Sequence, residues 1–176
     1  PPKTLILVVN TAYFGINLHR LEIFLMIKIM FVCHGNICRS PMAEYIMKDL
    51  TKNRNDVYVE SKAVSSEEIG NSIYPKAAAT LRKHNIPFGN HRARKTEKKD
   101  YDKFDYIIVM EEYNLSLLFG ILGEDPQKKV HKLLDFAAVS GDIEDPWYSR
   151  NFEKVFEQIT EGCKGLLEKI NKDETD

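Results

Sequence analysis

The stretch that decides the fold is residues 27–41, which read IKIMFVCHGNICRSP. Its first seven residues are rich in β-forming side chains and predict a strand over residues 27–33. A polar turn follows, and then Ser40 and Pro41, a pair typical of the N-cap and first position of a helix, which we expect to run to about Lys52. The sequence therefore predicts a strand, a loop and a helix in direct succession.

The same alternation continues toward the C-terminus. We predict further strands over residues 57–64, 106–110 and 129–134, and further helices over residues 75–85, 114–122 and 152–170. In the last helix the apolar residues recur at steps of three and four, which places them on one face. Strands that alternate with helices indicate an α/β fold, in which a parallel sheet is covered on both faces and ligands bind beyond the carboxyl ends of its strands.

Length and composition describe one ordinary domain. The 176 residues fit a single globular unit, and 43% hydrophobic residues are enough to bury a core. With 25 Lys and Arg against 26 Asp and Glu, the net charge of −1 gives no sign of nucleic-acid or membrane binding, and we expect neither. Three cysteines are too few for a disulfide scaffold and indicate free thiols, so we expect a cytoplasmic protein.

Residues 1–25 differ from the rest of the chain. They hold fourteen apolar or aromatic residues, but polar residues interrupt these, and no apolar run reaches the length of a membrane span. The run over residues 5–9 is too short for the core of a signal peptide. We expect a leader or extension outside the domain and place the domain at residues 26–176. The alternative is a natural extension that packs on the domain.

The loop after the first strand carries the candidate chemistry. It places the thiol of Cys33, the guanidinium of Arg39 and the hydroxyl of Ser40 between the end of a strand and the start of a helix. Backbone N–H groups of such a loop converge on an anion, the helix adds its positive dipole end, and an arginine binds two oxygens at once. Cysteines in such surroundings have pKa values well below about 8.5, so we expect Cys33 to attack as a thiolate.

Residues 33–41, CHGNICRSP, resemble the phosphate-binding loop of the low-molecular-weight protein tyrosine phosphatases, and the resemblance extends from Met26 almost to the C-terminus. Other matching motifs are Ser61, Ile69-Gly70-Asn71, Tyr74-Pro75, His91-Arg92-Ala93-Arg94, Phe104-Asp105-Tyr106, Met110 with Asn114, and Asp145-Pro146-Trp147-Tyr148. The resemblance implies a three-layer α/β fold with a four-stranded parallel sheet. It also implies hydrolysis of phosphomonoesters through a cysteinyl-phosphate, with no metal ion and no other cofactor.

The resemblance also selects the proton donor. The conjugate acid of a phenolate leaving group has a pKa near 10, so this group leaves poorly at pH 7 unless it is protonated as the P–O bond breaks. Similarity to the family's Asp-Pro-aromatic-aromatic loop assigns this role to Asp145. Pro146 favours an extended backbone at Asp145, which keeps it on a loop before the last helix. Asp145 would then activate the water that hydrolyses the cysteinyl-phosphate.

Supporting roles follow from the same resemblance. Asn36 and Ser40 of the loop would join Ser61 and His91 in a network that holds the loop and supports the thiolate. The remaining residues of the phosphate-binding loop are His34, Gly35, Ile37 and Cys38.

The rim of the expected cleft departs from the animal enzymes. Trp147 replaces the first of two common tyrosines, and with Tyr148 it would stack on the substrate ring. Glu67 stands where animal members often carry an aromatic residue, so the rim resembles bacterial-type enzymes. Glu111 replaces a common aspartate, for which the sequence offers no interpretation.

The other two cysteines are not expected to act as the nucleophile. Cys38 resembles the family's reversible disulfide partner of Cys33, and an ordinary core thiol is an equally good interpretation. Cys163 falls on the apolar face of the last helix and is expected in the core. The spacing of Cys33 and Cys38 is not a zinc pattern, because no second ligand pair follows.

The predicted function is hydrolysis of protein phosphotyrosine or small aryl phosphates, with release of inorganic phosphate, by a monomer or weak dimer. Two related activities remain open: an arginine phosphatase, which tends to have threonine where Ile37 stands, and an arsenate reductase, which needs further cysteines near the cleft. A catalytically silent phosphate-binding module is the third alternative. The presence of both Cys33 and Asp145 argues against it.

Overall fold

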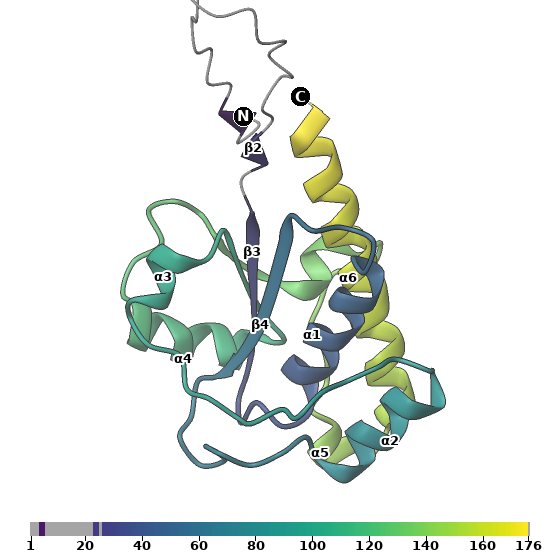
Figure 1. Cartoon of the computed structure of the whole chain (residues 1–176). Helices are drawn as coiled ribbons and strands as arrows, with labels where there is room; N and C mark the ends of the chain where they lie inside the picture. Colours follow the sequence, from purple (N-terminus) through teal and green to yellow (C-terminus); the bar gives the residue numbers. More distant parts are fainter. Residues whose placement is uncertain (1–3, 6–22, 25, 176) are drawn as a thin grey trace, which may run out of the picture.

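A four-stranded parallel sheet forms the centre of the protein in this computed structural model, which describes residues 4–5, 23–24 and 26–175 (Figure 1). The strands lie in the order β4-β3-β5-β6, and each neighbouring pair is parallel. They are β3 (Ile27–Cys33), β4 (Val57–Ala63), β5 (Tyr106–Val109) and β6 (Val130–Lys132). The predicted α/β class and the four-stranded parallel sheet are confirmed.

Strand β3 is buried on both of its faces. Ile29 and Phe31 belong to one apolar cluster, and Met30 and Val32 belong to another. Successive side chains of a strand point to opposite faces, so two clusters on one strand require a covering layer on each side of the sheet. This explains why residues 27–33 form a nearly continuous apolar run.

Helices supply both covering layers, as predicted (Figure 1). The cluster of Ile29 and Phe31 receives side chains from α1 (Arg39–Leu50), α2 (Pro75–Lys83) and α6 (Phe152–Thr175). The cluster of Met30 and Val32 receives them from α3 (Asp100–Lys103) and α4 (Glu112–Leu122). A single helical turn, α5 (Pro146–Ser149), precedes α6.

The apolar face predicted for the last helix is confirmed, and the helix continues five residues further, to Thr175. Its buried face packs on α1 and on a 3-10 turn, η1 (Leu133–Phe136). Gly165 allows this close approach, because a Cβ atom there would lie 1.8 Å from the carbonyl oxygen of Phe136.

The start of α1 differs from the prediction. Ser40 was expected at the N-cap, but the helix begins at Arg39 with Cys38 as its N-cap, and the Cys38 carbonyl accepts from the Met42 N–H at 3.2 Å. The Ser40 hydroxyl is not available as a cap because it lies against Cys33 Sγ at 3.0 Å. The phosphate-binding loop, rather than the helix, uses this side chain.

The predicted strand over residues 129–134 is also wrong in part. Only Val130–Lys132 pairs with β5, and the chain then turns into η1. The cause is local, since the Asp135 carboxylate accepts from the Lys132 N–H at 3.0 Å. The buried side chains of Leu133 and Leu134 are therefore part of a turn and not of a strand. Neither of the short helices α3 and α5 was predicted.

Four residues of the predicted leader are described. Thr4–Leu5 (β1) pairs antiparallel with Ile23–Phe24 (β2), apart from the main sheet. The rest of residues 1–25 lies outside the described residues, so the predicted domain boundary stays a prediction. Among the described residues, none of the helices could serve as a membrane span.

Candidate active site

The predicted loop surrounds a cavity at the carboxyl end of β3. The cavity measures about 260 Å³, and Cys33 lies in its wall. The residues that line it come from the loop, from the segment after β4 and from the start of α5. They are Cys33, His34, Gly35, Ile37, Cys38, Arg39, Glu67, Glu68, Asp145, Trp147 and Tyr148.

Two groups of the loop approach the buried sulfur of Cys33. The Asn36 N–H donates to Sγ at 3.3 Å, and the Ser40 hydroxyl lies 3.0 Å from Sγ. Asn36 has a φ of 58°, in the left-handed region that asparagine tolerates better than most residues. Such donors stabilise a thiolate more than a thiol.

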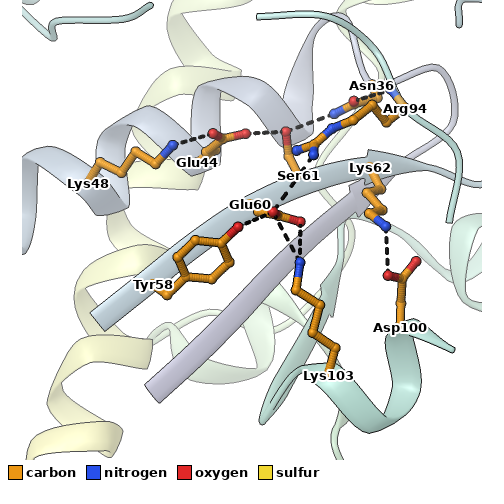
Figure 2. Close-up of polar contacts among 10 residues, drawn as sticks. All are labelled: Asn36, Glu44, Lys48, Tyr58, Glu60, Ser61, Lys62, Arg94, Asp100 and Lys103. Carbon is orange, nitrogen blue, oxygen red and sulfur yellow. Dashed lines mark hydrogen bonds and ion pairs between the residues drawn. The ribbon is translucent and has the colours of Figure 1, made fainter. Parts of the chain in front are cut away.

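Asn36 is also the centre of the predicted network, which the structure brings together; Figure 2 shows Asn36 with Ser61 and Arg94. Its side-chain amide donates to Ser40 Oγ at 2.9 Å and to Ser61 Oγ at 2.8 Å. Its side-chain oxygen accepts from the Arg94 N–H at 3.0 Å, which fixes the orientation of the amide. Its backbone carbonyl lies 2.8 Å from His91 Nε2.

His91 serves this network as a neutral donor. A carbonyl oxygen can only accept, so His91 Nε2 carries the hydrogen. Burial lowers the pKa of His91 from its ordinary 6.5, although the hydrogen bond to Asn36 acts in the opposite direction. The imidazole therefore stays uncharged at neutral pH.

Ion pairs on β4 hold the segment that carries His91 and Arg94 (Figure 2). Lys62 contacts Asp100 at 2.6 Å, and both side chains are buried. Glu60 contacts Lys103 at 3.2 Å and Arg94 at 3.7 Å. Residues 94–103 are thus tied to β4, the edge strand of the sheet.

Glu44 is a member of this network that the sequence reasoning missed. It lies buried in α1, accepts from the Ser61 hydroxyl at 2.5 Å, and pairs with Lys48 one turn later (Figure 2). A glutamate four residues before Lys48 in the predicted helix was the signal available in the sequence.

Arg39 is buried and joins two carboxylates from distant parts of the chain. Its guanidinium contacts Asp145 Oδ2 at 2.6 Å and Glu111 Oε1 at 2.8 Å, and it donates to the Ile143 carbonyl at 3.1 Å. Asp145 has the extended backbone that Pro146 favours, and its other oxygen accepts from the Trp147 N–H at 2.8 Å. The predicted acid therefore lies at the cavity, beside the predicted phosphate clamp.

The contact of Glu111 with Arg39 explains the residue that the sequence left without interpretation. Asn114, which is buried, donates to Glu111 Oε1 at 3.0 Å and orients it. Glu111 follows the end of β5 closely, at the edge of the sheet where ligands bind, and this position was the signal that could have found it.

The rim of the cavity has aromatic and polar parts. Trp147 and Tyr148 are 46% and 84% exposed, so both rings are free to contact a ligand. The carboxylate of Glu67 contacts His34 Nε2 at 3.2 Å, and the ring of His34 stacks with that of Tyr113 at 6.2 Å between centroids. Tyr113, on α4, was not singled out from the sequence.

The other two cysteines lie in different surroundings. Cys38 lines the cavity and is nearly buried; burial, followed by the charge of Cys33, raises its pKa. Cys163 is fully buried on α6, and burial raises its pKa as well. All three cysteines are free, and no group of three His, Cys, Asp or Glu side chains within the described ranges is arranged to hold a metal ion.

Comparison with protein families and sequences agrees with this geometry. The model of the family described as low molecular weight phosphotyrosine protein phosphatase matches residues 28–176. The chain is 38% identical over 153 residues to low molecular weight protein-tyrosine-phosphatase YfkJ of Bacillus subtilis, which covers 84% of this chain and 98% of that protein. It is 38% identical over 151 residues to PtpA of Staphylococcus aureus, covering 84% and 96%.

Solved structures show the same fold. The crystal structure of YfkJ from Bacillus subtilis matches with a TM-score of 0.81 and 38% identity, over 84% of this chain and 96% of that one. The crystal structure of DARP, a Drosophila arginine phosphatase, matches with a TM-score of 0.74 and 32% identity, over 82% and 98%.

Proposed function

This chain belongs to the low molecular weight phosphotyrosine protein phosphatase family, and we propose from this premise that Cys33, Arg39 and Asp145 carry its reaction. It is a protein tyrosine phosphatase and hydrolyses phosphomonoesters. The observation that supports the three assignments best is their common cavity, in which Asp145 contacts the guanidinium of Arg39 at 2.6 Å beside the sulfur of Cys33.

The first step transfers the phosphoryl group to the enzyme. Arg39 and the N–H groups of the loop bind the phosphoryl oxygens. The phosphoryl group thereby replaces one of the two carboxylates, Glu111 or Asp145, that contact the guanidinium in the structure. Cys33 Sγ attacks phosphorus, and an S–P bond forms as the bond to the phenolic oxygen breaks. Asp145, protonated at this stage, donates its proton to that oxygen, and the phenol leaves.

The second step regenerates the thiolate. Asp145, now a carboxylate, takes a proton from a water molecule that attacks phosphorus. The S–P bond breaks, and inorganic phosphate leaves. Cys33 departs as a thiolate, which the Asn36 N–H and the Ser40 hydroxyl stabilise from 3.3 and 3.0 Å.

The substrates that we propose are phosphotyrosine-containing proteins and small aryl phosphates, whose rings would stack on Trp147 and Tyr148. We further propose a cytoplasmic enzyme that is a monomer or weak dimer. Cys38 lines the same cavity as Cys33, which supports a reversible disulfide between them.

An arginine phosphatase is the second candidate, and the similarity to the Drosophila arginine phosphatase favours it. Ile37, in the position where arginine phosphatases tend to carry threonine, favours phosphotyrosine instead. An arsenate reductase would need a further thiol at the cleft, and the remaining cysteine, Cys163, is buried in the core on α6.

The test is hydrolysis of an aryl phosphate, a phosphotyrosine peptide and a phosphoarginine peptide in the presence of EDTA. We expect Cys33→Ser to abolish turnover and Asp145→Ala to slow it by about 10² to 10⁴. Cys163→Ala and Asp142→Asn are the matched controls, because they change a cysteine and an aspartate that do not line the cavity.

Activity that survives Cys33→Ser would overturn the cysteinyl-phosphate mechanism, and activity lost in EDTA would overturn the metal-free reaction. Faster release of phosphate from phosphoarginine than from phosphotyrosine would favour the second candidate.

A further inference from the structure

The mouth of the cavity carries two acidic side chains that the proposed reaction does not use. Glu67 and Glu68 lie in the segment between β4 and α2, and both line the cavity that holds Cys33 and Arg39. The side chain of Glu67 is 71% exposed, so its carboxylate is accessible to a ligand that enters from solvent.

Glu68 also lies against the phosphate-binding loop. Its side chain packs over Gly35, where an added Cβ atom would come within 3.0 Å of Glu68 Cγ, and its carboxylate accepts from Asn71 Nδ2 at 2.6 Å. Burial is the main cause of the raised pKa of Cys38, and the charge of Glu68 adds to it. Glu68 therefore lines the cavity from a position against the phosphate-binding loop.

Neither carboxylate contacts a lysine or an arginine among the residues that the structure describes. Glu67 has His34 as its partner and Glu68 has Asn71. The other acidic side chains around the site do have such a cation: Glu111 and Asp145 contact Arg39, Glu112 and Asp142 contact Lys132, and Glu144 contacts Lys154.

These contacts determine the charge that remains at the mouth of the cavity when a phosphoryl group is bound inside it. Arg39 is the single lysine or arginine among the residues that line the cavity, and a bound phosphoryl group takes up its charge. The mouth then keeps the negative charge of Glu67 and Glu68. A substrate segment that crosses this mouth meets two carboxylates that no lysine or arginine side chain neutralises.

We propose that Glu67 and Glu68 determine substrate specificity, by selecting phosphotyrosine segments that carry a lysine or arginine next to the phosphotyrosine. The inference rests on the proposed phosphotyrosine phosphatase function and names its substrate class. Each exposed ion pair changes a binding constant by up to about fivefold, and an acidic neighbour in the same place is repelled. We therefore expect a preference of about tenfold for a basic over an acidic neighbour.

The experiment compares two phosphotyrosine peptides that differ only in the residues beside the phosphotyrosine, lysine in one and glutamate in the other. The measured quantity is the ratio of their kcat/KM values, which cancels any effect of a variant on the chemical step. The enzymes are the full chain, Glu67→Gln, and Glu67→Gln combined with Glu68→Gln. The matched control is Glu112→Gln, an exposed glutamate that does not line the cavity.

We expect the full chain and Glu112→Gln to prefer the lysine peptide by about tenfold at low salt, and less as salt screens the charges. The ratio should fall in Glu67→Gln and approach one in the double variant. A ratio near one in the full chain, or an unchanged ratio in the double variant, would overturn the proposal. A small aryl phosphate distinguishes failure of this proposal from failure of the proposed function. If the full chain hydrolyses neither this compound nor either peptide, the proposed function is overturned as well.

Discussion

Replacing Glu111 with glutamine tests the role of the second carboxylate on Arg39. In the structure Glu111 Oε1 lies 2.8 Å from the guanidinium, and both side chains are largely shielded from solvent. Glutamine keeps the size of the side chain and an oxygen that accepts a hydrogen bond. Glu111→Gln therefore removes one charge and little else.

The magnitude follows from the geometry. Two unit charges at 2.8 Å attract by about 6 kcal/mol at an effective dielectric constant of 20, and the desolvation of both groups offsets most of this. Removing one partner of a buried ion pair costs about 3–5 kcal/mol when the remaining charge is left without any partner. Arg39 keeps its contacts with Asp145 and the Ile143 carbonyl, so we expect a loss of about 1–1.5 kcal/mol.

The assay is thermal unfolding of the full chain, in which a change of this size lowers Tm by about 2–6 °C for a protein of this length. Glu112→Gln is the matched control, because Glu112 is exposed and contacts Lys132 at 3.5 Å, and we expect it to shift Tm by less than about 2 °C. Equal Tm values for the two variants would refute the argument that Glu111 stabilises buried Arg39.

Two further predictions concern the loop. Burial lowers the pKa of His91, so as pH falls below about 6.5 this histidine takes up a proton more readily in the unfolded chain than in the folded protein. We therefore expect the free energy of unfolding to fall below that pH, and to fall less in His91→Gln. The measurement is urea unfolding at a series of pH values, and an equal pH dependence of the free energy of unfolding in the full chain and in His91→Gln would contradict this. Mild peroxide should oxidise Cys33 to a sulfenic acid, which the Cys38 sulfur attacks with loss of water to form a disulfide. Peptide mapping that finds Cys38 still alkylatable in the inactivated enzyme would reject it.

Much of the fold could be predicted because its signals are local. The apolar run over residues 27–33, the polar turn and the Ser-Pro pair predict a strand, a loop and a helix from neighbouring residues alone. The periodicity of the last helix is local as well. The strand predicted over residues 129–134 failed because the Asp135 carboxylate ends it, a choice between two local structures that the apolar pattern does not distinguish.

The sequence by itself determined the phosphate-binding loop, since the thiol, the arginine and the residues between them lie within one short segment. Only the tertiary structure decided what surrounds Arg39. Asp145 is 106 positions away along the chain, and its loop is held beside the end of β5 by the Ile143 N–H, which donates to the Met110 carbonyl at 2.8 Å. Glu111 had no interpretation until β5 placed it there. Contacts between distant residues depend on strand order and packing, which no short pattern encodes.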